Sequence, residues 1–189
     1  GALATENFLY EPEFIEPTTL ANLDKEKDQL RVFLHDARKR SLSSGLYDSA
    51  CEGIVRYTRA LDRRDWRVSF QELWTTLEYL TVTMRASYDV TVRRAAAMFR
   101  DHDLMMEIVK HLRDVRNEIV HATAEQPGME SLMYQLKGIV EVLLGLYLSN
   151  SHNLRSRDEV AEFLDTPKDL PRLKRKRQII NAALAFRSQ

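Results

Sequence analysis

The sequence of 189 residues contains only one cysteine, Cys51, the residue that forms disulfides and many zinc clusters. It also contains few residues that break helices, with six glycines and five prolines. A single cysteine excludes an internal disulfide framework and any zinc cluster built on cysteines, and it is typical of a reducing compartment. We therefore expect a cytoplasmic protein. Because breakers are few and 44% of the residues are hydrophobic, the composition favours one helical domain with a real core.

Net charge is also absent, because 28 basic side chains balance 28 acidic ones. No overall positive field exists to hold nucleic acid, so a polyanion would have to meet local basic patches. The charges are unevenly spread: residues 1–16 carry four glutamates and no Lys or Arg, whereas residues 172–177 carry five basic side chains. The apolar runs fall short of a membrane span and the start is acidic, so neither a transmembrane helix nor a secretory signal is expected.

Apolar residues recur every three or four positions along most of the chain, which predicts amphipathic helices. Pro12 and Pro17 disfavour a helix near the start, so we expect an extended arm there. Ser156, with Glu159 as its capping-box partner, and Asp169 are expected to begin two late helices, the last ending near Phe186. The earlier helices are expected at about 20–40, 47–61, 66–84, 90–99, 103–121 and 129–147.

These segments predict an all-α protein, an antiparallel helical bundle of four to five core helices with an additional C-terminal helix. We divide the chain into an acidic extended N-terminal arm (1–17), a helical bundle (18–150) and a C-terminal helical extension packed on the bundle (151–189). The chain opens with Gly-Ala-Leu and no methionine, so a further domain upstream is part of the expectation.

Residues 113–122 read RDVRNEIVHA and close the helix expected at 103–121. On a helical projection one stripe forms a core seam, and Arg116, Asn117 and His121 gather away from it. Apolar residues also lie on that far side, so something apolar must cover it. Another helix of the same chain would do so, and so would a second copy across a two-fold axis, which we prefer. The seam consists of Leu104, Ile108, Leu112, Val115, Ile119 and Ala122, and the far-side apolar residues are Met105, Met106, Val109 and Val120.

His121 is expected in the last turn of its helix, where free carbonyls raise the pKa of the imidazole while Arg113 and Arg116 lower it. A histidine poised near neutrality takes a proton from a ribose 2′-hydroxyl or gives one to the leaving 5′-oxygen. The Arg116 guanidinium would neutralise charge on the phosphorane, and Asn117 would orient the imidazole or a phosphate oxygen. The pattern indicates metal-independent RNA cleavage, whereas a histidine that merely caps carbonyls is the structural alternative.

The string Arg116-Asn117-Glu118-Ile119-Val120-His121 resembles the signature of HEPN domains, helical ribonucleases of toxin–antitoxin, abortive-infection and CRISPR-associated systems. FQELWTTLEYLT at 70–81, RRAAAMF at 93–99 and residues 158–186 are similar to the Apea-like HEPN group. The resemblance implies an all-α bundle, a homodimer through the motif helix, and an endoribonuclease that leaves a 2′,3′-cyclic phosphate. It implies catalytic Arg116 and His121, supported by Asn117.

Two other functions stay open. Some HEPN domains bind without cutting, so an inactive helical module that binds RNA, a nucleotide or a protein partner is the first alternative. A purely structural dimerisation domain of a larger enzyme is the second. The expected partners are an RNA substrate, a second copy, and an upstream domain or an inhibitor protein, with no membrane.

Further side chains are candidates for supporting roles. Glu78, on the helix expected at 66–84, would orient His121 or an arginine, or pair with a surface base instead. Lys110 and Arg113 flank the motif. The basic residues near the end would track an RNA backbone without reading its sequence, or form a solvated face: Arg172, Lys174, Arg175 and Arg177. The other histidines lack ligand spacing and no phosphate-binding loop is present, so neither a metal nor a cofactor is expected.

Overall fold

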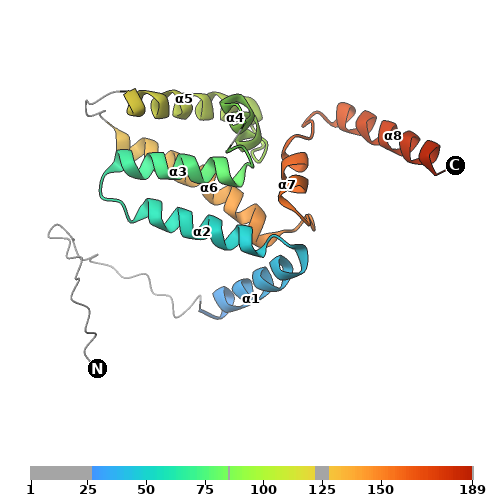
Figure 1. Ribbon diagram of the computed structural model, residues 1–189, viewed down its shortest axis with the longest axis horizontal. Coiled ribbons are helices and arrows are strands. Elements are labelled where there is room, and N and C mark those ends of the chain that lie inside the picture. The colour runs from blue at the N-terminus through green and yellow to red at the C-terminus, as the bar shows by residue number, and fades with distance from the viewer. Residues whose placement is uncertain (1–26, 85, 122–127, 189) are drawn as a thin grey trace. The chain divides into compact units, whose positions relative to one another are not determined.

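The computed structural model describes residues 27–84, 86–121 and 128–188 (Figure 1). The chain divides into two compact units, residues 1–34 and 35–189, and the helical bundle belongs to the second. The expected arm at 1–17 lies outside the described residues, and so does the start of the first expected helix. The described residues form helices and contain no strand, which confirms the predicted all-α class.

The helices follow the predicted segments closely. One of them, α2 at Tyr47–Leu61, has the predicted bounds, and most of the others differ from the prediction by a few residues at their ends. Their bounds are α1 Lys27–Ser44, α3 Trp66–Leu80, α4 Tyr88–Ala96, α5 His102–His121, α6 Met129–Ser149, α7 Arg157–Leu164 and α8 Leu170–Arg187.

The helix α3 ends at Leu80, earlier than the predicted end near Met84. Val82 has a φ of 58°, in the left-handed region that a β-branched residue rarely adopts, and this conformation ends the helix. Buried hydroxyls hold the turn: the Thr81 and Thr83 oxygens lie 2.8 Å apart, and Thr91 of α4 donates to Thr83 over 2.7 Å. The end of α3 is therefore tied to α4 by hydrogen bonds that the apolar pattern does not encode.

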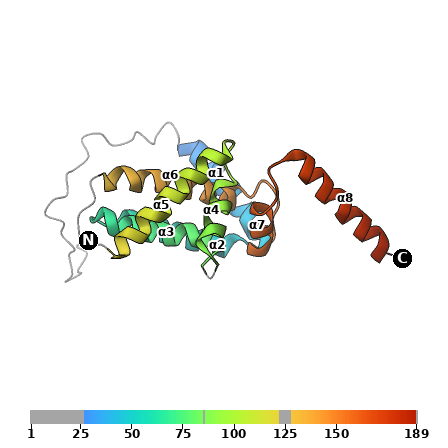
Figure 2. The ribbon, with the colours of Figure 1, turned by 90° about the horizontal axis from the view of Figure 1, so that it is seen from above.

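The centre of the bundle is formed by α3 and α6. These two pack along each other, α2 lies against both, and α5 contacts both from the opposite side with α4 packed on it (Figures 1 and 2). The helix α5 ends at the end of the bundle where α3 and α6 begin (Figure 1). Large side chains of the two central helices fill the core and are fully buried, or nearly so: Phe70, Leu73, Trp74, Leu77, Leu136, Leu143 and Tyr147.

The helix α6 is long and apolar enough, by length and composition, to cross a membrane, which the sequence analysis did not expect. Leu136, Val140 and Leu143 of this helix are buried in the core of the bundle. A core helix passes the same test of length and composition, so the feature is weak support for a membrane span.

The two late helices begin at the predicted caps. The Ser156 hydroxyl accepts from the Glu159 backbone N–H over 3.2 Å, and the Asp169 carboxylate accepts from the Arg172 N–H over 3.1 Å. The predicted capping box is only half formed, because the Glu159 carboxylate accepts from the backbone N–H of Arg155, 2.7 Å away, and thereby fixes the residue before the cap.

Burial differs between the two helices of the C-terminal extension. Val160 and Leu164 of α7 are buried, and α7 contacts α4. No residue of α8 is buried. For α8, the expectation of packing on the bundle therefore has no buried side chain to support it.

Candidate functional site

The buried face of the motif helix α5 keeps most of the predicted seam and extends beyond it. Val109 and Leu112 are fully buried, and Val115 and Ile119 nearly so. Val109 was expected on the far side and is a core residue, whereas Leu104, expected in the seam, is 56% exposed. The reason is that α5 packs against α4 as well as against α3 and α6, so that helices cover more than one of its sides. Leu104 lies in the first turn of α5.

Part of the far side of α5 is covered by the chain's own helices. Met105 and Met106 are partly buried and pack against the core, so for these residues and Val109 the cover is the chain's own bundle, the alternative that we did not prefer. Val120 is different, because it is 52% exposed and lies directly before His121. His111, on the same helix, is also exposed.

Arg116 of the motif is half-buried between α5 and the start of α4. Its guanidinium carbon lies 5.2 Å from the centroid of the Tyr88 ring, within range of a cation–π interaction. Its Nη1 donates to the side-chain oxygen of Asn117 over 3.3 Å. Among the described residues, Arg116 has no carboxylate partner, so these two contacts orient its charge without neutralising it. Sequence reasoning missed Tyr88, because nothing in the local pattern points to a residue so far from the motif.

Asn117 contacts the arginine of the motif through the same hydrogen bond. From the sequence, this amide is expected to orient the imidazole or a phosphate oxygen. In the structure its oxygen is used by Arg116, and its side-chain N–H₂ group is the part that remains to donate to a ligand.

Arg113 and Lys110 differ from Arg116 because both pair with carboxylates. Arg113 donates to Asp114 over 2.9 Å and to Asp89 of α4 over 3.1 Å. Lys110 donates to Glu107 over 2.7 Å, one turn earlier on the same helix. The neighbouring negative charges reduce the attraction of these two cations for a phosphate, so Arg116 is the strongest anion-binding candidate among the described residues of the motif helix.

The end of α5 is anchored by Arg67, which the sequence analysis did not single out. Its Nη2 donates to the backbone carbonyl of Ile119 over 3.3 Å, and this carbonyl is among those that helix termini leave unpaired. A basic residue in the first turn of α3 interacts unfavourably with the dipole of its own helix. This position is the sequence signal that Arg67 contacts another part of the chain.

His121 is the last residue of α5, and its side chain lies outside the described residues, as do residues 122–127. Helix geometry fixes its backbone relative to Arg116: five positions correspond to a rise of about 7.5 Å and a rotation of about 140°. Asn117 lies between the two on this projection.

Glu78 forms its side-chain hydrogen bond on its own helix. Its carboxylate accepts from the indole N–H of Trp74 over 2.9 Å, one turn earlier on α3. Because Arg67 contacts Ile119, the end of α5 lies beside the start of α3, and Glu78 is eleven positions, or about 16 Å, further along that helix. The structure does not bring Glu78 together with Arg116.

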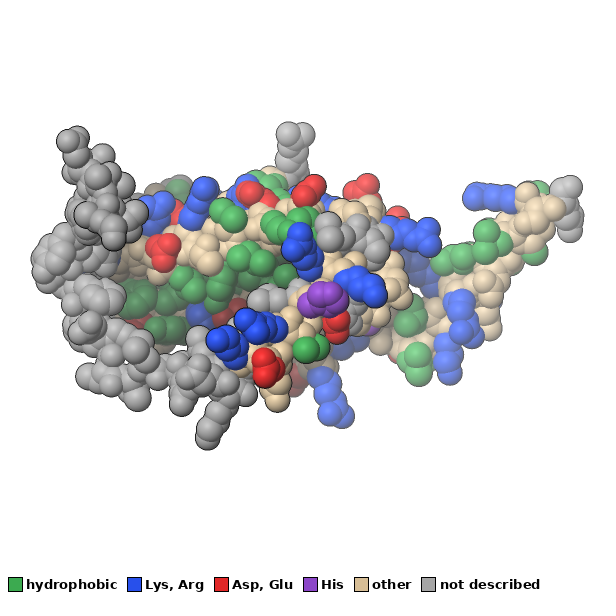
Figure 3. All heavy atoms as spheres, turned by 90° about the horizontal axis from the view of Figure 1, so that it is seen from below, with side chains coloured by type: hydrophobic (Ala, Val, Ile, Leu, Met, Phe, Trp, Pro, Cys, Tyr) green, Lys and Arg blue, Asp and Glu red, His purple; other side chains and the backbone are tan. Residues whose placement is uncertain are grey.

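The predicted RNA-backbone residues lie on α8 and are exposed: Arg172, Lys174, Arg175 and Arg177. Figure 3 shows this helix, at the right, with blue and green side chains and no red ones. Arg172 also lines a hollow of about 370 Å³ together with Arg93, His102 and Lys168.

Asp165 lines the same hollow. Hydrogen bonds from Arg94 and then Arg93 hold the pKa of Asp165 at about 2, against the opposing effect of burial. The carboxylate is therefore charged at neutral pH and disfavours an anion there. Among the described residues, no group of three or more His, Cys, Asp or Glu side chains is placed to hold a metal ion.

Comparison of the chain with protein-family models finds none that matches, and comparisons with curated proteins and with solved structures find no match either. The candidate site therefore stands on the residues of this chain alone.

Proposed function

We propose that this chain is a HEPN-type endoribonuclease that cleaves RNA without a metal ion, with Arg116 and His121 as its catalytic pair and Asn117 in support. The observation that carries the proposal is the placement of Arg116. It is half-buried over Tyr88 and contacts no carboxylate among the described residues. A guanidinium in this setting keeps its attraction for a phosphate.

In the proposed reaction the His121 imidazole takes the proton from a ribose 2′-hydroxyl. The 2′-oxygen then attacks the adjacent phosphorus, and the bond to the 5′-oxygen breaks. That oxygen leaves with a proton from an imidazolium, and the RNA keeps a 2′,3′-cyclic phosphate. Arg116 stabilises the charge that grows on the non-bridging oxygens, the usual place for a preorganised cation in phosphoryl transfer.

The active unit of this proposal is a dimer through the motif helix, in which a second copy brings a second His121 for the acid step. Val120, beside His121, is 52% exposed, and a second copy packed against this end of α5 would bury its side chain. An effector of a bacterial defence or toxin–antitoxin system in the cytoplasm would fit an RNA-cleaving domain of this kind.

The test is cleavage of a labelled single-stranded RNA by the purified chain in EDTA. The expected result is cleavage by the wild type and a loss of roughly 100-fold or more in Arg116→Ala and in His121→Ala. His111→Ala is the matched control, since His111 is an exposed histidine on the same helix, and it should cleave like the wild type. Mass spectrometry should find a cyclic phosphate at the new 3′ end.

Cleavage that survives in both motif variants would contradict the proposal. So would a failure of every protein to cleave while the wild type still binds the RNA, which is the behaviour of the inactive binding module.

A further inference from the structure

The exposed helix α8 carries a regular apolar stripe. Leu170, Leu173, Ile180 and Leu184 recur with the three-and-four spacing of a coiled-coil seam, in which Arg177 takes the remaining position. Each of these four apolar side chains is exposed. Because no residue of α8 is buried, packing within its own chain stabilises this helix little. A partner that covers the apolar seam would stabilise it more.

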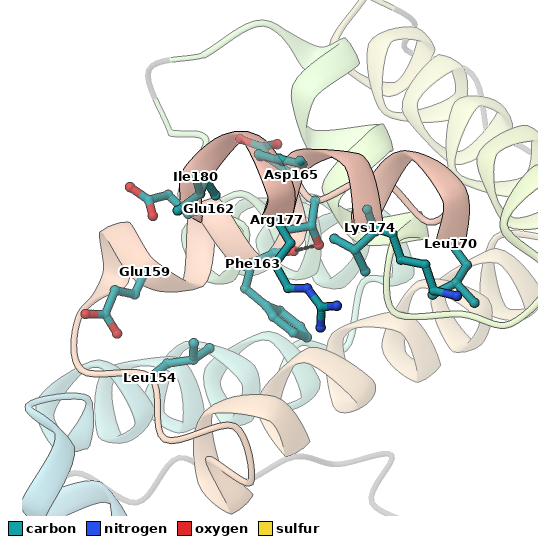
Figure 4. Close-up of a pocket in the computed structure, with 12 residues that line it drawn as sticks. Leu154, Glu159, Glu162, Phe163, Asp165, Leu170, Lys174, Arg177 and Ile180 are labelled. Atoms are coloured by element: carbon teal, nitrogen blue, oxygen red, sulfur yellow. Dashed lines mark hydrogen bonds between the residues drawn. The ribbon is translucent and has the colours of Figure 1, made fainter. Parts of the chain in front are cut away.

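The seam faces an open groove. The groove has a volume of about 990 Å³ and lies between α8 and the segment around α7. Figure 4 shows Leu154 and Phe163 on the side of α7, and Leu170 and Ile180 on α8. The apolar floor and the length of α8 suit a helix as the occupant, because a helix inserts side chains at matching intervals.

The two rims of the groove carry opposite charges. Glu159 and Glu162 lie on the rim of α7, and Lys174 and Arg177 on the rim of α8 (Figure 4). RNA or an anionic membrane would meet the acidic rim as well as the basic one, and neither fills an apolar concave floor. An apolar helix that carries cations fits the apolar floor and is attracted to Glu159 and Glu162 of the acidic rim, and this is the chemistry of α8 itself.

We infer that α8 pairs with α8 of a second copy, antiparallel, each helix lying in the groove of the other. The charges of α8 select the direction. Its basic residues are confined to the first half, apart from Arg187, and the helix contains no Asp or Glu. A parallel pair would set each cation beside its own copy. In an antiparallel pair with Leu173 opposite Leu184, the two copies of Arg172 are roughly 20 Å apart along the axis and those of Lys174 roughly 13 Å, beyond the screening length of about 8 Å at physiological salt. The two copies of Arg177, at the centre of the pair, stay roughly 4.5 Å apart along the axis, and Arg187 lies near Arg172 of the second copy. The antiparallel direction therefore separates most, but not all, of the like charges that a parallel pair would bring together.

This contact is separate from the one proposed through α5, and it does not rest on nuclease activity. It gives the basic run at 174–177 a structural role: the cations flank the second copy's apolar half and reach its acidic rim. Arg177 takes part in the seam with its stem while its charge stays at the edge, as long basic side chains do at coiled-coil interfaces.

The first test compares Ile180→Glu with Ile179→Glu in the full chain. The two positions are adjacent on α8 and 50% and 55% exposed, but only Ile180 lines the groove. By sedimentation equilibrium, Ile180→Glu should weaken the α8 contact by roughly 30-fold or more, because it buries a charge in the seam. The mass should fall to half that of the wild type, and Ile179→Glu should keep the wild-type mass. Neither site is buried in one chain, so neither substitution should change the unfolding of the single chain.

The second test fixes the direction by disulfide cross-linking in a Cys51→Ser background. A mixture of Leu173→Cys and Leu184→Cys chains should cross-link, and Leu173→Cys alone should not. A monomeric wild type, an unchanged mass in Ile180→Glu, or efficient cross-linking between two copies of Leu173→Cys would overturn the inference. So would a monomeric chain whose α8 binds anionic vesicles or RNA instead.

Discussion

The Arg116 guanidinium lies over the ring of Tyr88, with 5.2 Å between the guanidinium carbon and the ring centroid. This contact joins the motif helix α5 to the first residue of α4, and it fixes an arginine whose other contact is Asn117 on its own helix. The orientation of the candidate catalytic cation therefore depends on the packing of α4 as well as on the motif.

The first prediction concerns the Tyr88 ring. Tyr88→Leu removes the π face while keeping an apolar side chain, so cleavage of RNA in EDTA should fall by roughly 3- to 30-fold. Tyr88→Phe keeps the face and should stay within about twofold of the wild type. Initial rates under single-turnover conditions measure both variants. An equal loss in the two would show that the phenol hydroxyl matters, and no loss in either would show that Arg116 is oriented without the ring.

The sequence predicts much of this fold because its apolar spacing reports the local face of each helix. The core side chains of α3 and α6, such as Leu73 and Leu143, follow from periodicity alone. Val109 was assigned wrongly, because a helical projection does not tell how many neighbours cover a helix. The burial of Val109 follows from the packing of α5 against α3, α4 and α6, which only the structure shows.

The contacts at the candidate site were less accessible to sequence reasoning. The motif itself is local, so Arg116, Asn117 and His121 are found by spacing. Arg67 and Tyr88 come from α3 and α4, and their roles depend on tertiary packing that no spacing in the chain records.

The second prediction concerns Asp165, which ties α7 to α4. Its carboxylate accepts from Arg94 over 2.7 Å and from Arg93 over 2.8 Å, and these bonds lower the pKa of Asp165 to about 2. Because the pair is partly exposed, Asp165→Asn should lower the free energy of unfolding by only about 1 kcal/mol at pH 7. The folded pKa lies below the unfolded value of about 3.9, so this contribution is complete above roughly pH 4 and is lost as the pH falls towards 2.

Urea unfolding across that pH range measures the effect, and the curves of variant and wild type should converge at the acid end. A matched pair of arginines tests the same cluster. Arg94→Gln should cost about 2 kcal/mol, because its 13% exposed side chain also donates to the carbonyls of Thr81 and Val82. Arg93→Gln, 50% exposed, should cost less. Equal costs would contradict this account of Arg94.

The third prediction concerns Tyr147, whose buried hydroxyl donates to the carbonyl of Leu80 over 2.9 Å. Tyr147→Phe should lower the free energy of unfolding by about 1 kcal/mol, because the carbonyl at the end of α3 loses its partner. Burial raises the pKa of Tyr147 to about 12. The folded pKa thus exceeds the unfolded value near 10, so the contribution is complete below roughly pH 10 and is lost as the pH rises towards 12.

Alkaline unfolding should therefore be less steep in pH for Tyr147→Phe than for the wild type. Tyr134→Phe is the control, since Tyr134 lies on the same helix and is 53% exposed, and it should match the wild type at every pH. A Tyr147→Phe curve parallel to that of the wild type would show that this hydroxyl does not titrate on unfolding.

The last prediction uses two helical glycines that differ in their surroundings. A Cβ on Gly145 of α6 would meet nothing within 4 Å, whereas a Cβ on Gly53 of α2 would lie 3.0 Å from methyl carbons of Leu80 and Leu144. Alanine is favoured over glycine in a helix by roughly 1 kcal/mol, and Gly145→Ala should raise the free energy of unfolding by about that amount. Gly53→Ala should lose this gain and destabilise by about 1 kcal/mol or more, because the Cβ forces α2 away from α3 and α6. Thermal unfolding of the two variants, measured side by side, tests this difference. An equal gain in stability in both would mean that the leucine methyl groups move aside without cost. Close contact at Gly53 would then not set the distance of α2 from α3 and α6.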